Sequence, residues 1–377
     1  MRRFIAFIAI PAIFLACSKD EAIVPPSTTN STSVGNSDTY SPSDMVLIYG
    51  GGSQRSPYTW DSDRMGDYVT YSEENGITHW LFDGFLFLEI LDYGDEESTD
   101  VMFTSGYGYE SATKDDWEAL LDYWFQEDTG IGAVEQAVED AVASLGEPPS
   151  KRQIVLCIPE PITTLDPDVS GSTSTYWGSL DGVELSFSSS EDRVAACEWF
   201  VDEAVERFEA MGYSQLELNA FYWLAEKATN SRTILEDISD YVHNLGYDFV
   251  WVPYYGADGY SEWYALGFDT AYLQPNYFFN SSLDSSRMDD ACTLALTYSM
   301  GMEIEFDDDA MSTGGKASRL REYMETFKEY GIWDGYPLSY YQNNQSLRYL
   351  KYSSVSDDNE LYHELCQFIV TRPTRIE

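Results

Sequence analysis

Short apolar runs alternate with longer amphipathic stretches along the chain from Met45 onward. The short runs predict strands, and apolar positions three and four residues apart predict helices. The expected strands are 46–49, 78–83, 153–159, 215–219, 249–253, 270–274, 302–306 and 337–341. The helical patterns between them include 61–75, 114–145, 190–211, 231–245, 287–300 and 315–330, and the connection near 260–266 is short.

This repeated alternation of strand and helix predicts a (β/α)8 barrel of the TIM type over residues 45–377. Each connection between parallel strands needs a right-handed helical crossover, and eight such units close most simply into a barrel. An open doubly wound sheet is the alternative architecture.

The ends of the expected strands carry many polar and aromatic side chains. In a barrel, binding and catalytic groups gather where the strands end at their carboxyl side. The candidates at these ends are Asp83, Glu160, Asn219, Tyr222, Trp223, Tyr254, Tyr255, Gln274, Asn276, Tyr277, Glu303, Glu305 and Asp307. Aromatic rings suit the C–H faces of sugars and amides suit their hydroxyls, so we expect these residues to bind a glycan.

The seventh expected strand places three carboxylates on one face. Side chains alternate along a strand, so Glu303, Glu305 and Asp307 face one way while the apolar residues between them face the helices. A buried carboxylate without a partner is costly. We therefore expect a functional group here, the alternative being that Glu303 pairs with a buried cation such as Arg55.

Glycoside hydrolysis needs two carboxyl groups that flank the scissile bond. Glu305 suits the role of nucleophile or base, and Glu226, beyond the fourth strand, suits the acid. This resembles the clan of retaining barrel hydrolases with an acid after strand four and a nucleophile at strand seven. In that clan Asn directly precedes the acid, whereas six residues separate Asn219 from Glu226 here. Glu160 is the reserve acid and Asp83 a third candidate.

The N-terminus has the pattern of an export signal. Two arginines precede an apolar run in residues 1–16 that is too short for a permanent membrane helix. The run ends at Cys17 as in a lipobox, which predicts lipidation, the alternative being an ordinary secretory peptide. The segment after Cys17, Ser-Lys-Asp-Glu, resembles the acidic signal of Bacteroidota lipoproteins displayed on the outer membrane. Surface display is thus expected first and the periplasm second.

Composition limits the partners. Residues 17–44 hold Pro, Ser, Thr, Asn and Gly with few large apolar side chains, which predicts a disordered linker. The net charge of -44 opposes binding to nucleic acid or anionic membranes. Cys157, Cys197, Cys292 and Cys366 lack metal-ligand spacing, and the acids at 307–309 are more simply solvated than bound to calcium. We expect no metal and no cofactor, and the oligomeric state is open.

Several motifs resemble one uncharacterised family. They are the segments 82–87, 216–223, 273–279 and 301–307. Their content and order are similar to the domain-of-unknown-function family 4855, found in Bacteroidota lipoproteins and other secreted bacterial proteins. The resemblance runs from about Val46 to Tyr341 and implies no assigned activity.

Two main hypotheses of function follow. The first is a glycoside hydrolase that uses Glu305 with Glu226 or Glu160, and the second is a surface glycan-binding protein without catalysis. A barrel enzyme of another hydrolytic class is a third possibility. The geometry of the carboxyl groups at the mouth separates the first two.

Overall fold

A computed structural model describes residues 42–55, 59–93, 100–106, 110–163 and 175–375. The expected signal peptide, Cys17 and most of the linker lie outside these residues. Asp44, assigned to the linker from the sequence, begins the first strand.

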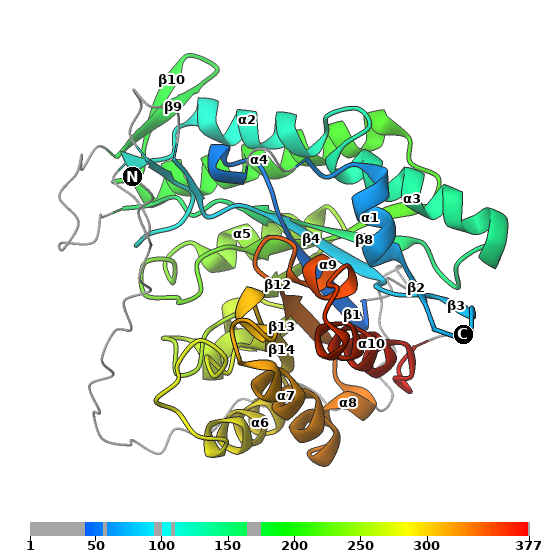
Figure 1. Cartoon of the computed structure of the whole chain (residues 1–377). Coiled ribbons are helices and arrows are strands. Elements are labelled where there is room, and N and C mark those ends of the chain that lie inside the picture. Colours follow the sequence, from blue (N-terminus) through cyan, green and yellow to red (C-terminus); the bar gives the residue numbers. More distant parts are fainter. Residues whose placement is uncertain (1–41, 56–58, 94–99, 107–109, 164–174, 376–377) are drawn as a thin grey trace, which may run out of the picture.

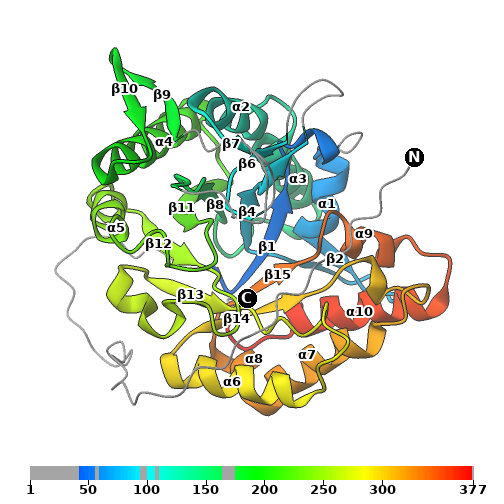
Figure 2. The same ribbon diagram turned by 90° about the vertical axis from the view of Figure 1, so that its left-hand side faces the viewer.

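The predicted (β/α)8 barrel is confirmed. Eight strands, all paired in parallel, close into one barrel surrounded by helices (Figures 1 and 2). In chain order they are β1 (Asp44–Tyr49), β4 (Gly84–Leu88), β8 (Arg152–Ile158), β11 (Leu216–Trp223), β12 (Asp248–Trp251), β13 (Thr270–Leu273), β14 (Gly301–Glu305) and β15 (Leu338–Tyr341). β15 pairs with β1 and closes the ring.

The outer layer consists mostly of helices that bury one apolar face against the barrel. The α-helices are α1 (Ser62–Val69), α2 (Lys114–Trp124), α3 (Gly130–Leu145), α4 (Ser190–Met211), α5 (Leu235–Asn244), α6 (Ser286–Tyr298), α7 (Ala317–Glu329), α8 (Ile332–Gly335), α9 (Ser346–Lys351) and α10 (Ser356–Val370). A 3-10 helix, η2 (Tyr260–Leu266), makes the short connection noted from the sequence. No helix in the described ranges is both long and apolar enough to cross a membrane.

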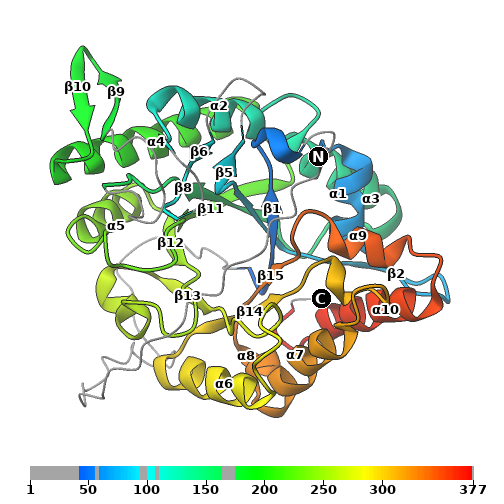
Figure 3. The same cartoon turned by 60° about the vertical axis from the view of Figure 1, so that its left-hand side comes forward.

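Smaller elements decorate the barrel. β2 (Thr70–Ser72) pairs with β3 (Thr78–Trp80), and β5 (Leu91–Asp92), β6 (Val101–Met102) and β7 (Glu110–Ser111) form a three-stranded sheet. The hairpin of β9 (Tyr176–Leu180) and β10 (Val183–Ser186) projects away from the barrel (Figure 3).

Two strand assignments made from the sequence are wrong. The second barrel strand is β4 rather than 78–83, because the expected segment forms the antiparallel partner of β2. The fourth strand continues past Asn219 to Trp223, with a bulge at Asn219. Strands of a parallel barrel are buried on both faces, so their continuous apolar runs conceal where they begin and end.

A buried ionic cluster closes the end of the barrel where the strands begin. Arg372 Nη1 lies 2.6 Å from Asp44 Oδ1, and both side chains are fully buried. Arg375 pairs with the same carboxylate at 3.2 Å, and the Tyr340 hydroxyl donates to it at 2.6 Å. Residues just after the linker are thus fastened to the C-terminal segment.

Candidate active site

The carboxylates of β14 face the inside of the barrel. Glu303 is in register with Ser339 on β15, whose hydroxyl donates to Glu303 Oε1 at 3.4 Å, and Glu305 is in register with Tyr341. Both glutamates are nearly inaccessible to solvent, at 2% and 3% exposure. The alternation expected along this strand is therefore observed.

Glu305 is held by three hydrogen-bond donors. The Tyr323 hydroxyl, from α7, donates to Glu305 Oε2 at 2.7 Å, and the backbone amides of Asn276 and Tyr277 also donate to this carboxyl group. Burial raises the pKa of Glu305 to about 7, although the three donors favour the ionised form and oppose the increase. Glu305 therefore changes charge near neutral pH.

Glu303 lies one layer deeper and has weaker support. Burial, and then repulsion from Glu305 and Glu226, raise the pKa of Glu303 well above its ordinary range, and only the Ser339 hydroxyl lowers it. Burial and repulsion therefore favour the protonated form of Glu303 more than that of Glu305, which has more hydrogen-bond donors to its ionised form.

Glu226 belongs to the same site and comes from β11, three strands away from β14 around the barrel. It stands three residues beyond the end of β11, and Gln274 Nε2 donates to its Oε1 at 2.9 Å. Burial raises the pKa of Glu226 despite the bond from Gln274. Its side chain retains partial exposure, whereas Glu303 and Glu305 are buried. Repulsion from Glu226 raises the pKa of Glu303 and of Glu305. The charge on Glu226 therefore affects the protonation of both.

Tyrosines and one ion pair complete the mouth. Tyr49, at the end of β1, meets Tyr341 edge to face at 5.8 Å between ring centroids. Arg55 lies over the Tyr49 ring at 4.7 Å and binds Glu89 through two nitrogens, at 2.6 and 2.7 Å. The sequence-based alternative that Arg55 neutralises Glu303 is therefore wrong, because its partner is Glu89.

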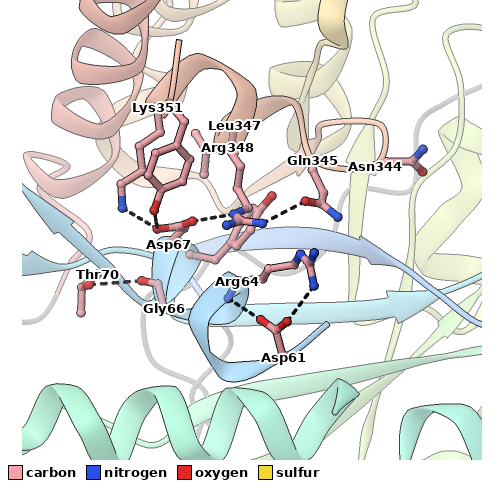
Figure 4. A network of polar contacts seen from close by, with 12 residues as sticks. Asp61, Arg64, Gly66, Asp67, Thr70, Asn344, Gln345, Leu347, Arg348 and Lys351 are labelled. Carbon is pink, nitrogen blue, oxygen red and sulfur yellow. Dashed lines mark hydrogen bonds and ion pairs between the residues drawn. The ribbon is translucent and has the colours of Figure 1, made fainter. Parts of the chain in front are cut away.

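The loop after β15 braces this ion pair. Asn344 accepts a hydrogen bond from Arg55, and the short helix α9 follows directly. Figure 4 shows how α9 is fastened: Arg348 and Lys351 each approach the Asp67 carboxylate of α1 at 2.5 Å. The network ties the loop after the last strand to the first helix.

The structure places Asp83 at the wrong end of the barrel for a role at the mouth. It directly precedes β4, and its carboxylate accepts the backbone amides of Ser43 and Asp44 at 3.0 and 2.8 Å. A recess of about 330 Å³ lies beside it, with Trp80 and Arg152 among the residues lining it. Asp83 thus organises the end of the barrel opposite the mouth.

Glu160 follows β8, but its contacts are structural. Thr104 Oγ1 and the Ser105 amide both donate to Glu160 Oε2 at 2.8 Å, and its side chain is 3% exposed. These bonds fasten the end of β8 to the loop after β6. No described interaction joins Glu160 to Glu305, so Glu226 is the acid that the structure brings together with it.

Most of the expected aromatic platforms are occupied by protein contacts. Trp223 is fully buried against Phe249 at 6.3 Å between centroids. Tyr277 donates to Glu322, and Arg319 covers its ring at 4.1 Å. Neither ring is free to stack on a sugar.

The remaining candidates divide between the mouth and the supporting loops. Tyr222 lies at the mouth near Tyr49, and Tyr254 is partly exposed beside Glu226. The Tyr255 ring is covered by Arg287 at 4.0 Å. Asp307 accepts the Asp309 amide at 2.8 Å and caps the 3-10 helix η3 (Asp308–Ala310). Asn219 lies in the bulge of β11, and its Oδ1 atom is buried without a hydrogen-bond partner.

Sequence reasoning missed Glu89, Arg55 as its partner, and Tyr323. Glu89 directly follows the apolar run 84–88, so correct placement of the second strand would have revealed it. Tyr323 has no such signal, because a tyrosine on the inner face of a helix has the same pattern as a core residue. In the described part of the chain, no group of three or more His, Cys, Asp or Glu side chains is arranged to hold a metal ion.

Comparisons with known proteins identify one family and solved structures of low similarity. Residues 44–367 match a family described as a domain of unknown function, DUF4855. A mutant tryptophan synthase alpha-subunit from Pyrococcus furiosus is 9% identical with a TM-score of 0.37, covering 87% of this chain and 97% of that one. Concanavalin B is 11% identical with a TM-score of 0.40, covering 85% and 99%. No curated protein matches the sequence.

Proposed function

We propose that this chain, which belongs to the DUF4855 family, is a glycoside hydrolase that uses Glu305 and Glu226 as its carboxyl pair. One observation carries the proposal. A carboxyl group after the fourth strand and another at the end of the seventh lie in one mouth, where the first raises the pKa of the second. Glycosidic bonds are cleaved by two carboxyl groups in different protonation states.

The donors around each group suggest their roles. Glu305 has three donors that favour its ionised form, which suits attack on the anomeric carbon. Glu226 has one amide donor and partial exposure, which suits exchange of a proton with a leaving group and with water.

The proposed reaction has two balanced steps. A Glu305 oxygen bonds to the anomeric carbon while the glycosidic C–O bond breaks and Glu226 gives its proton to the leaving oxygen. Glu226 then takes a proton from water, whose oxygen bonds to the anomeric carbon as the ester to Glu305 breaks. Burial and the neighbouring carboxylates raise the pKa of Glu303, beneath Glu305, which reduces the negative charge that Glu303 adds to the site.

The test is a screen of the purified protein against aryl glycosides and a panel of oligosaccharides. We expect Glu305→Gln to lower kcat/KM by about a thousandfold or more on any substrate found. Glu226→Ala should lose activity and regain it with azide, a small nucleophile that needs no general base. Glu209→Gln, an exposed carboxyl on α4, is the matched control and should leave turnover unchanged.

The same screen separates the alternatives. Full turnover by Glu305→Gln would overturn the assignment. A glycan that binds the wild type without being cleaved would instead support the second candidate, a non-catalytic glycan-binding protein.

The proposal extends to the location of the protein. The lipobox-like sequence that ends at Cys17 and the acidic residues after it support lipidation and display on the outer membrane, where a glycan would be met outside the cell.

A further inference from the structure

We propose that Tyr323 is a positioning residue that fixes the orientation of the Glu305 carboxylate and keeps the negative charge of the β14 pair on Glu305 rather than Glu303. Its catalytic meaning rests on the proposed function. The geometry that supports it, and the first experiment below, do not depend on turnover.

The Tyr323 hydroxyl is itself held in place. It donates to Glu305 Oε2 at 2.7 Å and accepts the Phe278 amide at 3.2 Å. Burial raises the pKa of Tyr323 well above its ordinary value, so the hydroxyl keeps the proton that it donates. One hydroxyl thus links α7, the loop after β13 and the carboxylate.

The conformation of the loop after β13 also fixes the two backbone amides that donate to Glu305. Asn276 has a φ of 51°, in the left-handed region that few residues adopt, and its Oδ1 accepts the Tyr255 amide at 3.1 Å. This brace holds the turn that directs the amides of Asn276 and Tyr277 to Glu305. The donors are therefore arranged before any substrate binds.

Helix α7 makes further contacts with this loop. Arg319 covers the Tyr277 ring and donates to the Tyr277 and Leu283 carbonyls, the latter at 2.7 Å. Glu322 accepts from the Tyr277 hydroxyl. Tyr323 consequently approaches Glu305 from a helix that is joined to this loop by several contacts.

The contrast with Glu303 identifies the role of Tyr323. Glu303 and Glu305 lie on the same strand and face, but the described donor to Glu303 is a single hydroxyl at 3.4 Å. Of the three donors to Glu305, only Tyr323 acts through a side chain. The ionisable groups that face this pair from the surrounding elements are Glu226, Tyr323, Tyr341, Asp307 and, across Tyr341, Arg55.

The first experiment measures urea unfolding of Tyr323→Phe at pH 5 and pH 8. The lost bond favours ionised Glu305, so we expect a larger drop of the urea midpoint at pH 8 than at pH 5. Tyr213→Phe removes a hydroxyl without a hydrogen-bond partner far from the mouth and should have the same effect at both pH values. In a Glu305→Gln background, the pH dependence of the Tyr323→Phe effect should disappear.

A midpoint change that is equal at both pH values, or that keeps its pH dependence in the Glu305→Gln background, would overturn the inference. Should Tyr323→Phe fail to fold, Asn276→Gly preserves the left-handed turn, removes its brace and should show the same dependence on pH. Where a glycan substrate is found, Tyr323→Phe should move the acidic limb of kcat/KM upward by about one pH unit with little change in KM. If no glycan is cleaved, the proposed function fails while the unfolding experiment still decides the role of Tyr323.

Discussion

The difference in the free energy of unfolding between Glu305→Gln and the wild type should favour the variant more at pH 8 than at pH 5. The pKa of Glu305 is raised from an ordinary 4.5 to about 7 by burial. At pH 8 this group is ionised in both the folded and the unfolded chain, whereas at pH 5 it is protonated in the folded chain and mostly ionised in the unfolded chain, so folding takes up a proton there. Stability from this group therefore increases as the pH falls from about 7 towards 4.5.

The size of the effect follows from the displacement of the pKa. Glu305 should contribute about 2.5 kcal/mol less to the free energy of unfolding at pH 8 than at pH 5. Glutamine has no charge to lose, so the advantage of Glu305→Gln over the wild type should grow by that amount between the two conditions. Its amide leaves a donor without an acceptor, which costs about 1–3 kcal/mol at every pH and cancels in the comparison.

Urea unfolding followed by tryptophan fluorescence at several pH values measures this difference. Glu209→Gln, exposed on α4, is the control and should track the wild type. A difference between Glu305→Gln and the wild type that stays constant from pH 5 to pH 8 would refute the reasoning, because Glu305 would then have the same pKa in the folded and unfolded chains.

Three other predictions concern the ion pair and the N-terminus. Glu89→Gln leaves Arg55 partly buried without its partner carboxylate and should lower the free energy of unfolding by about 3 kcal/mol, measured by urea titration; a change near zero would contradict it. Cys17→Ala should release the protein from membranes on fractionation, and retention would argue against a lipid anchor. Proteolytic removal of the segment before Pro42 should leave the melting temperature nearly unchanged, whereas a large drop would show that the segment packs on the barrel.

The sequence predicted the architecture because alternation and length are local properties. The carboxylates of β14 were placed correctly for the same reason, since a period of two assigns each residue to a face. The assignment failed for Asp83, where a continuous apolar run gave no signal of where the strand began.

The parts of the site that the sequence did not predict depend on contacts between distant elements. Tyr323 contacts Glu305 because α7 packs against the loop after β13. Glu89 and Arg55 come together because one follows the end of β4 and the other the end of β1. Trp223 and Tyr277 have the composition of sugar platforms, but packing against Phe249 and Arg319 takes their surfaces. Residue type alone does not distinguish a ring that faces solvent from one that faces a neighbour.

The buried cluster around Asp44 has a consequence for how an anchored molecule would be oriented. It fixes the start of β1 at the end of the barrel opposite the mouth, so a tether from Cys17 joins the body on that side. The 26 residues from Cys17 to Pro42 span at most about 90 Å when fully extended. A lipid at Cys17 would therefore be connected to the body of the protein at the end of the barrel opposite the mouth, and the mouth would stay clear of the point where the tether joins.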